Sequence, residues 1–249
     1  MGINALQELN MGGVRWELAE TAAKNNVSAK NVQQKIQSQT NRIETKPIIV
    51  PASAPITLNT VKYMVERPEN ISSLVRMIAE FNHPLRNGAT NVVMPNIANN
   101  PNGLVIITDM PSADDDLSGK ILSGGAGEMI DKMLSAIEMS RENVSMIPLV
   151  FWRTPGGRTP SREELDLVRP FTDKIIEMIQ PKIILTLGTL AATEIAKINL
   201  TSSHGNEIED EKGYKIFPIY HPNYLMLKPS AKKDVWNVLQ NVQKLLKNQ

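Results

Sequence analysis

The chain has 249 residues and a formal net charge of +1, from 27 basic and 26 acidic side chains, so its overall charge does not announce a nucleic-acid partner. It has no cysteine, which excludes disulfides and thiolate-bound metals or clusters. Three histidines lie far apart without ligand spacing, and we expect no metal site and no cofactor. Because the chain has neither an apolar run of membrane-spanning length nor a signal-peptide pattern, we expect a cytoplasmic protein with no membrane partner.

The first 70 residues predict a helical segment followed by a flexible linker. Residues 4–23 indicate one or two short helices, whereas residues 24–46 are rich in polar side chains and bury little surface. Two prolines favour an extended chain over residues 48–55. A helical pattern at Thr57–Glu66 precedes the main domain, which we place at residues 71–249.

From about residue 70, strand and helix patterns alternate. Apolar runs predict strands at residues 104–108, 183–187 and 215–219, with a short edge strand at 91–94. Residues 144–152 form a further apolar run, which Pro148 interrupts. Helical spacing predicts helices at 72–81, 127–139, 161–179, 190–198 and 234–247, and residues 199–213 form a polar loop. The alternation favours an α/β fold, a three-layer sandwich with a mostly parallel central sheet.

Polar segments follow three of the expected strands. Asp109–Asp116 is an acidic loop that leads through glycines into a helix, Arg153–Arg158 is a basic loop, and His221 follows the last strand. In a parallel sheet these segments lie at one edge, where ligands bind in open α/β folds. The competing interpretation of Asp109–Asp116 is an ordinary connection whose acids are solvated.

These segments resemble the uracil-DNA glycosylase superfamily, most closely its iron–sulfur class, family four. Asp109–Asp116 resembles the family's Gly-Glu-Ala-Pro-Gly-x-x-Glu-Asp segment, and Gly124–Gly127 resembles the following helix start. Three more ordered matches complete the likeness: Arg153–Pro160, Gln180–Gly188 and Tyr220–Leu225. The similarity covers about residues 104–246 and implies the family's three-layer fold.

The resemblance implies base-excision DNA repair, in which a glycosidase hydrolyses the bond between an extruded uracil and its deoxyribose. His221 stands in the motif whose histidine contacts the departing base, and Asp109 or Asp115 would position the attacking water. The base pocket implied by the same motifs is lined by Met110, Pro111, Ser112, Leu122 and Pro148.

Several positions depart from the family pattern. Pro148 replaces the asparagine that reads the uracil edge, Leu122 replaces the stacking aromatic residue, and Asp109 replaces a glutamate. The cluster cysteines expected near Pro84, at Trp152 and near Val168 are absent. We therefore expect a degraded uracil pocket and apolar packing, with Trp152, in place of the cluster.

DNA, either uracil-containing or single-stranded, is the expected partner. Residues 213–249 carry six lysines and one acid, a local balance of +5 that favours phosphate contacts. Around the expected site, the candidate DNA-binding residues are Arg153, Arg158, Tyr224, Leu225, Lys228, Lys232 and Lys233, and Met226 lies in the same apolar wedge. The alternative for the lysines of the last helix is a solvated face.

Two interpretations of function remain open. In the first, the protein is a glycosylase that acts on uracil or another damaged base with a rearranged pocket. In the second, it is a catalytically inactive relative that acts as a DNA-binding or protein-interaction module. Loss of the asparagine favours altered specificity, because a pocket that lacks a pairing group discriminates poorly.

Overall fold

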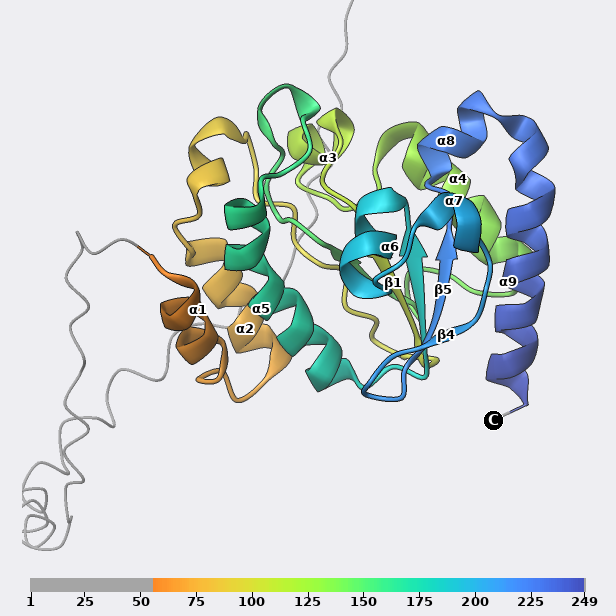
Figure 1. Cartoon of the computed structure of the whole chain (residues 1–249), viewed down its shortest axis with the longest axis horizontal. Helices are drawn as coiled ribbons and strands as arrows, with labels where there is room; N and C mark the ends of the chain where they lie inside the picture. Colours follow the sequence, from red (N-terminus) through yellow and green to blue (C-terminus); the bar gives the residue numbers. More distant parts are fainter. Residues whose placement is uncertain (1–55, 249) are drawn as a thin grey trace, which may run out of the picture. The chain divides into compact units, whose positions relative to one another are not determined.

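The computed structural model describes residues 56–248, which form a sheet covered by helices on both faces (Figure 1). The strands are β1 (Leu104–Thr108), β2 (Ser145–Pro148), β3 (Ile183–Leu187), β4 (Ile208–Glu209) and β5 (Lys215–Ile219). Their order is β2-β1-β3-β5-β4, with β4 antiparallel and the other neighbours parallel. The predicted three-layer α/β fold is confirmed, whereas the expected segments within residues 1–55 lie outside the described part of the chain.

Side chains of the central strands alternate between two apolar cores. Val105 and Ile107 of β1 pack on one face of the sheet, and Leu104 and Ile106 pack on the other. This is the period of two that a strand imposes, here with both faces buried. The first core is covered by α1 (Leu58–Val65), α2 (Ile71–Glu80), α5 (Arg162–Ile179) and α6 (Thr189–Ile195). The second is covered by α4 (Gly124–Ala136), α8 (Pro222–Leu227) and α9 (Lys232–Lys247).

Most expected elements form near their predicted bounds, and capping explains several ends. Ser161 and Glu164 make a capping box at the start of α5, where the sequence predicts a helix. Helix α2 begins with a second capping box, formed by Asn70 and Ser73. Helix α1 packs in the first core through Val61 and Val65, although from the sequence we expect residues 57–66 to precede the main domain.

Three expected connections differ from the structure. A short helix, α3 (Ala113–Ser118), begins within the expected Asp109–Asp116 loop, because Ser112 and Asp115 form a capping box there. The polar loop after α6 contains α7 (Leu200–Ser203) and β4. Residues 91–94 form only an isolated bridge to Lys120 instead of an edge strand, and Pro95 follows without an N–H to extend the pairing.

An aromatic cluster occupies the region where the family resemblance implies an iron–sulfur cluster. The buried rings of His83 and Trp152 stack with centroids 5.0 Å apart at an interplanar angle of 3°, and Val168 is fully buried in the same core. His83 accepts the Leu85 N–H through Nδ1, and its Nε2 lies 3.0 Å from the Glu164 carbonyl oxygen. With no thiolate anywhere in the chain and this volume filled by rings, these residues do not fit an iron–sulfur cluster.

We expect Trp152→Ala to lower the free energy of unfolding by about 3–5 kcal/mol, because it removes a fully buried ring and leaves a cavity in the first core. Urea unfolding followed by circular dichroism measures this loss. Tyr63→Ala, at a side chain that is 63% exposed, is the control and should cost less than about 0.5 kcal/mol. If Trp152→Ala lowered the free energy of unfolding by a similarly small amount, the packing role of Trp152 would be contradicted.

Candidate active site

Strand register brings the predicted site residues to one edge of the sheet. Thr108 of β1 lies level with Pro148 of β2 and Leu187 of β3, and Leu187 lies level with Ile219 of β5. The residues that follow these strands therefore emerge together, above the sheet in Figure 1. They include Asp109 and, one residue beyond Tyr220, His221.

Asp109 contacts the first turn of α6. Its Oδ1 accepts the Ala191 N–H at 2.6 Å, one of the backbone donors that a helix start leaves unpaired. Gly188 precedes this turn at φ +101°, and a Cβ there would clash with the Asp109 carboxylate. Burial raises the pKa of Asp109 to about 6, although hydrogen bonds from Ala191 and Leu190 act in the opposite direction.

Asp115 holds two loops together. Its Oδ2 accepts the Ser112 N–H at 2.9 Å and its Oδ1 accepts the Ser123 N–H at 2.6 Å. Ser112 Oγ in turn accepts the Asp115 N–H at 3.1 Å. Both carboxylate oxygens are thus engaged by backbone, which assigns Asp115 to linking α3 with the start of α4.

His221 is the N-cap of α8, and its Nδ1 accepts the Asn223 N–H at 3.2 Å. Burial lowers the pKa of His221 to about 4, against the opposing effect of the Asp115 charge. The imidazole is therefore neutral at physiological pH. Because Nδ1 accepts, the ring proton lies on Nε2, which makes His221 an uncharged hydrogen-bond donor.

The expected base-pocket side chains offer few polar groups. Met110 is half-buried and its Sδ accepts Thr154 Oγ1, while Pro111 and Pro148 are buried. The Ser112 N–H donates to the Asp115 carboxylate, and the Ser112 hydroxyl oxygen accepts the Asp115 N–H. Leu122 is only 2% exposed and packs in the second core.

Arg141 was not anticipated from the sequence, yet it binds the backbone at Leu122, one of the expected base-pocket residues. Its guanidinium donates to the carbonyls of Ile121 and Leu122 at 2.8 and 2.7 Å and pairs with Asp131 at 2.7 Å. These contacts hold Leu122 at φ +50°, a strained conformation for leucine. No local pattern points to this arginine, because its partners lie 10 to 20 residues away.

The expected DNA-binding residues differ in how exposed their side chains are. Tyr224, Lys228, Lys232 and Lys233 are exposed, and Arg153 is half-buried. Arg158 is exposed but forms a two-point ion pair with Glu164, at 2.8 and 2.6 Å. Leu225 is 1% exposed, and the apolar side chains that project from α8 are Met226, at 42%, and Leu227, at 85%.

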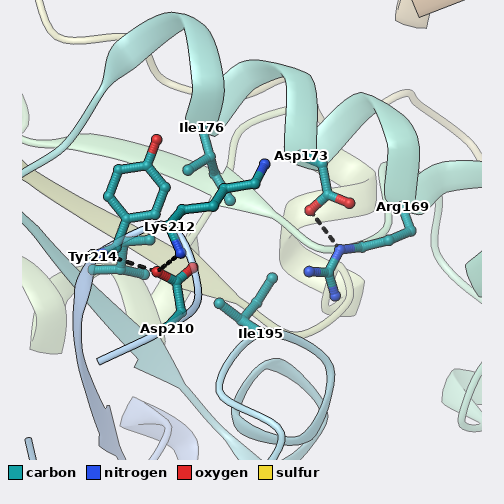
Figure 2. Close-up of a pocket in the computed structure, with 8 residues that line it drawn as sticks. Arg169, Asp173, Ile176, Ile195, Asp210, Lys212 and Tyr214 are labelled. Carbon is teal, nitrogen blue, oxygen red and sulfur yellow. Dashed lines mark hydrogen bonds and ion pairs between the residues drawn. The ribbon is translucent and has the colours of Figure 1, made fainter. Parts of the chain in front are cut away.

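A separate cavity lies away from this edge. It has a volume of about 140 Å³ and is lined by residues that include Arg169, Asp210 and Tyr214 (Figure 2). Ile184 and Tyr214 place it near the amino ends of β3 and β5, opposite His221. Within residues 56–248, no group of three or more histidines and acids is arranged to hold a metal ion, and no helix is long and apolar enough to cross a membrane.

Comparison with known proteins matches residues 95–243 to the model of the uracil DNA glycosylase superfamily. The chain belongs to this superfamily. A type-4 uracil-DNA glycosylase of Archaeoglobus fulgidus is 28% identical over 176 residues, 67% of this chain and 88% of the relative. The type-4 enzyme of Thermotoga maritima is 32% identical over 146 residues, 57% of this chain and 76% of the relative. That of Saccharolobus solfataricus is 30% identical over 150 residues, 56% of this chain and 69% of the relative.

Asp115→Ala should lower the free energy of unfolding by about 2–4 kcal/mol, because two backbone N–H groups lose a charged acceptor. Thermal or urea unfolding measures the loss. Asp114→Ala, at the neighbouring exposed acid, is the matched control and should change little. If Asp115→Ala left stability intact, the linking role of Asp115 would be wrong.

Proposed function

We propose that this superfamily member is a uracil-DNA glycosylase-type hydrolase of base-excision repair. It would act on an extruded nucleotide carrying uracil or another damaged base, and would work in the cytoplasm. The observation that carries the proposal is the position of His221, half-buried at the carboxyl edge of the sheet, with Nδ1 accepting the Asn223 N–H and Nε2 without a hydrogen-bond partner among residues 56–248. Burial lowers the pKa of His221 to about 4, which favours a neutral ring that donates through Nε2–H. The similarity to enzymes named type-4 uracil-DNA glycosylases supports the choice of uracil.

The proposed reaction breaks the bond between C1′ of the sugar and the base nitrogen. The bonding electrons leave with the base, the sugar gains oxocarbenium character, and a water oxygen then bonds to C1′. Nε2–H of His221 donates to a carbonyl oxygen of the departing base, where negative charge develops. The water releases a proton, and the base anion takes one up, so atoms and charge balance.

Asp109 completes this proposal. Above pH 6 its carboxylate is ionised, and its negative charge at the strand edge would favour the cationic sugar and orient the attacking water. Among residues 56–248, the described hydrogen bonds to the Asp109 carboxylate come from the first turn of α6. The two carboxylate oxygens of Asp115 are instead needed to join α3 with the start of α4, which favours Asp109 over Asp115 for this role.

DNA contact is proposed around α8. Within the described residues Lys215 pairs with Glu207 and Lys247 with Glu138, at 2.6 and 2.7 Å. Lys228, Lys232 and Lys233 are exposed beside Met226 and Leu227. This arrangement suits an apolar wedge flanked by phosphate contacts, and the affinity should fall steeply with salt.

The first test is excision of uracil from a labelled single-stranded oligonucleotide, read after alkaline cleavage under single-turnover conditions. His221→Ala should reduce the rate about 100- to 1000-fold, because it removes a hydrogen-bond donor to the leaving base. His221→Gln, whose amide can donate, should recover part of the loss. An unchanged rate in His221→Ala would contradict the proposed role.

The pH profile tests Asp109. Between pH 8 and pH 5 the single-turnover rate should fall as the Asp109 carboxylate takes up a proton, with a midpoint near its pKa of about 6. His221 stays neutral over this range because its pKa is about 4. Asp109→Asn should be slow and should lose the midpoint. A profile that is flat in the wild type, or equal in both proteins, would remove Asp109 from the mechanism.

A non-catalytic DNA-binding module is the second candidate, and Pro148 is the observation that favours it. Pro148 is buried at the end of β2 and offers neither a side-chain donor nor an acceptor for a base edge. Salt-sensitive DNA binding without excision of uracil would support this module, or a glycosylase for another base. Loss of both activities in a folded protein would point to a protein-interaction module.

A further inference from the structure

Three aromatic rings form a continuous column at the base of α8. The rings of His204 and Tyr220 stack with centroids 4.1 Å apart at 21°, and those of Tyr220 and Tyr224 lie 4.7 Å apart at 35°. Lys228 Nζ lies 5.9 Å from the centre of the Tyr224 ring and ends the series. The column therefore connects the α7 corner, the end of β5 and the exposed helix α8.

His204 stands on a firmly held corner of the chain. The next residue, Gly205, donates its N–H to the Pro218 carbonyl of β5 at 2.8 Å. Gly205 adopts φ +76°, and a Cβ there would lie 2.6 Å from Val238 of α9. Because this corner fits between β5 and α9, the His204 ring has a fixed base from which to contact Tyr220.

The His204 side chain contributes a ring rather than a hydrogen bond. Its Nε2 is buried and has no hydrogen-bond partner among residues 56–248. Burial also keeps the pKa of His204 below its usual value, against the opposing charge of Asp234. A neutral ring with an unpaired buried nitrogen is costly, and stacking on Tyr220 is the described interaction that offsets the cost.

Helix α8 needs such support. It has six residues, too few for a stable helix by itself, and its N-cap bond from Asn223 to His221 is 3.2 Å long. Tyr220 immediately precedes His221 in the sequence, and Tyr224 lies about one helical turn after His221. Any rotation of this ring pair would move both the imidazole of His221 and the exposed side chain of Leu227.

We propose that His204 is a positioning residue for DNA binding and base excision: its ring, through Tyr220, holds α8 so that Tyr224 and Leu227 face DNA while His221 faces the base. This inference rests on the proposed function and extends it to a residue outside the family-like motifs. His204 itself does not touch the substrate.

A double-mutant cycle tests the coupling. The probe is a labelled single-stranded oligonucleotide containing 2′-fluoro-2′-deoxyuridine, which resists cleavage, and the readout is the Kd from fluorescence anisotropy. Tyr224→Ala should weaken binding about tenfold, the usual loss of an aromatic contact to a base. His204→Ala should weaken it about three- to tenfold, the value of an aromatic pair. The double variant should bind about as weakly as Tyr224→Ala alone, because both changes break one column.

Two variants separate positioning from general stability. His204→Phe keeps the ring and removes the unpaired nitrogen, so it should restore binding to within about twofold of the wild type. Val61→Ala opens the first core, on the opposite face of the sheet from α8 and α9, and should lower the melting temperature while leaving the Kd nearly unchanged. The inference would be overturned if the losses of binding free energy in the two single variants added in the double variant. It would also be overturned if His204→Phe bound DNA as weakly as His204→Ala.

Hydrogen exchange in the free protein gives a readout that needs no DNA. His204→Ala should accelerate exchange of the Leu225 and Lys228 amides, which bond to the His221 and Tyr224 carbonyls within α8, but not of β3 amides. Unchanged exchange would overturn the positioning role. If the wild-type protein neither bound nor cleaved DNA and His204→Ala still accelerated this exchange, the proposed function would be refuted and the column would remain a support for α8 alone.

Discussion

The register of four parallel strands is the constraint on which the rest of the site depends. Thr108, Pro148, Leu187 and Ile219 lie level across the sheet, so four chain segments leave it side by side. A shift of one residue in any strand would turn its side chains to the opposite face. Burial of both faces in separate cores makes such a shift costly, and the sheet thereby positions Asp109 and His221.

Different environments give three nearby titratable groups different roles. Asp115 is fully occupied by backbone donors and joins two helices. Asp109 is buried enough for its pKa to rise to about 6, whereas burial lowers the pKa of His221 to about 4. Near neutral pH this leaves one negative charge and one neutral donor at the same edge, a combination suited to separating a cationic sugar from an anionic base.

Aromatic packing fills the part of the first core where the family resemblance implies a metal cluster. His83 and Trp152 stack in the first core, in a protein without cysteine, and so stabilise the region between α2 and α5 by buried area and ring contact. A second aromatic series, from His204 to Tyr224, supports the exposed helix beside the site. Each cluster links segments that are distant in sequence, and local sequence patterns do not predict such contacts.

Local patterns by themselves determined the main strands, the larger helices and the family likeness, because hydrophobic periodicity and ordered motifs are properties of neighbouring residues. They also identified Asp109 and His221 as candidates, while the short helix α3 was missed because polar residues carry its cap. Only the tertiary structure decided that Asp115 is bound by backbone, that Leu225 is buried and that Arg141 binds the Leu122 carbonyl. The physical reason is that burial, pKa and hydrogen-bond partners depend on contacts between distant segments, which exist only once the sheet has brought its strand ends together.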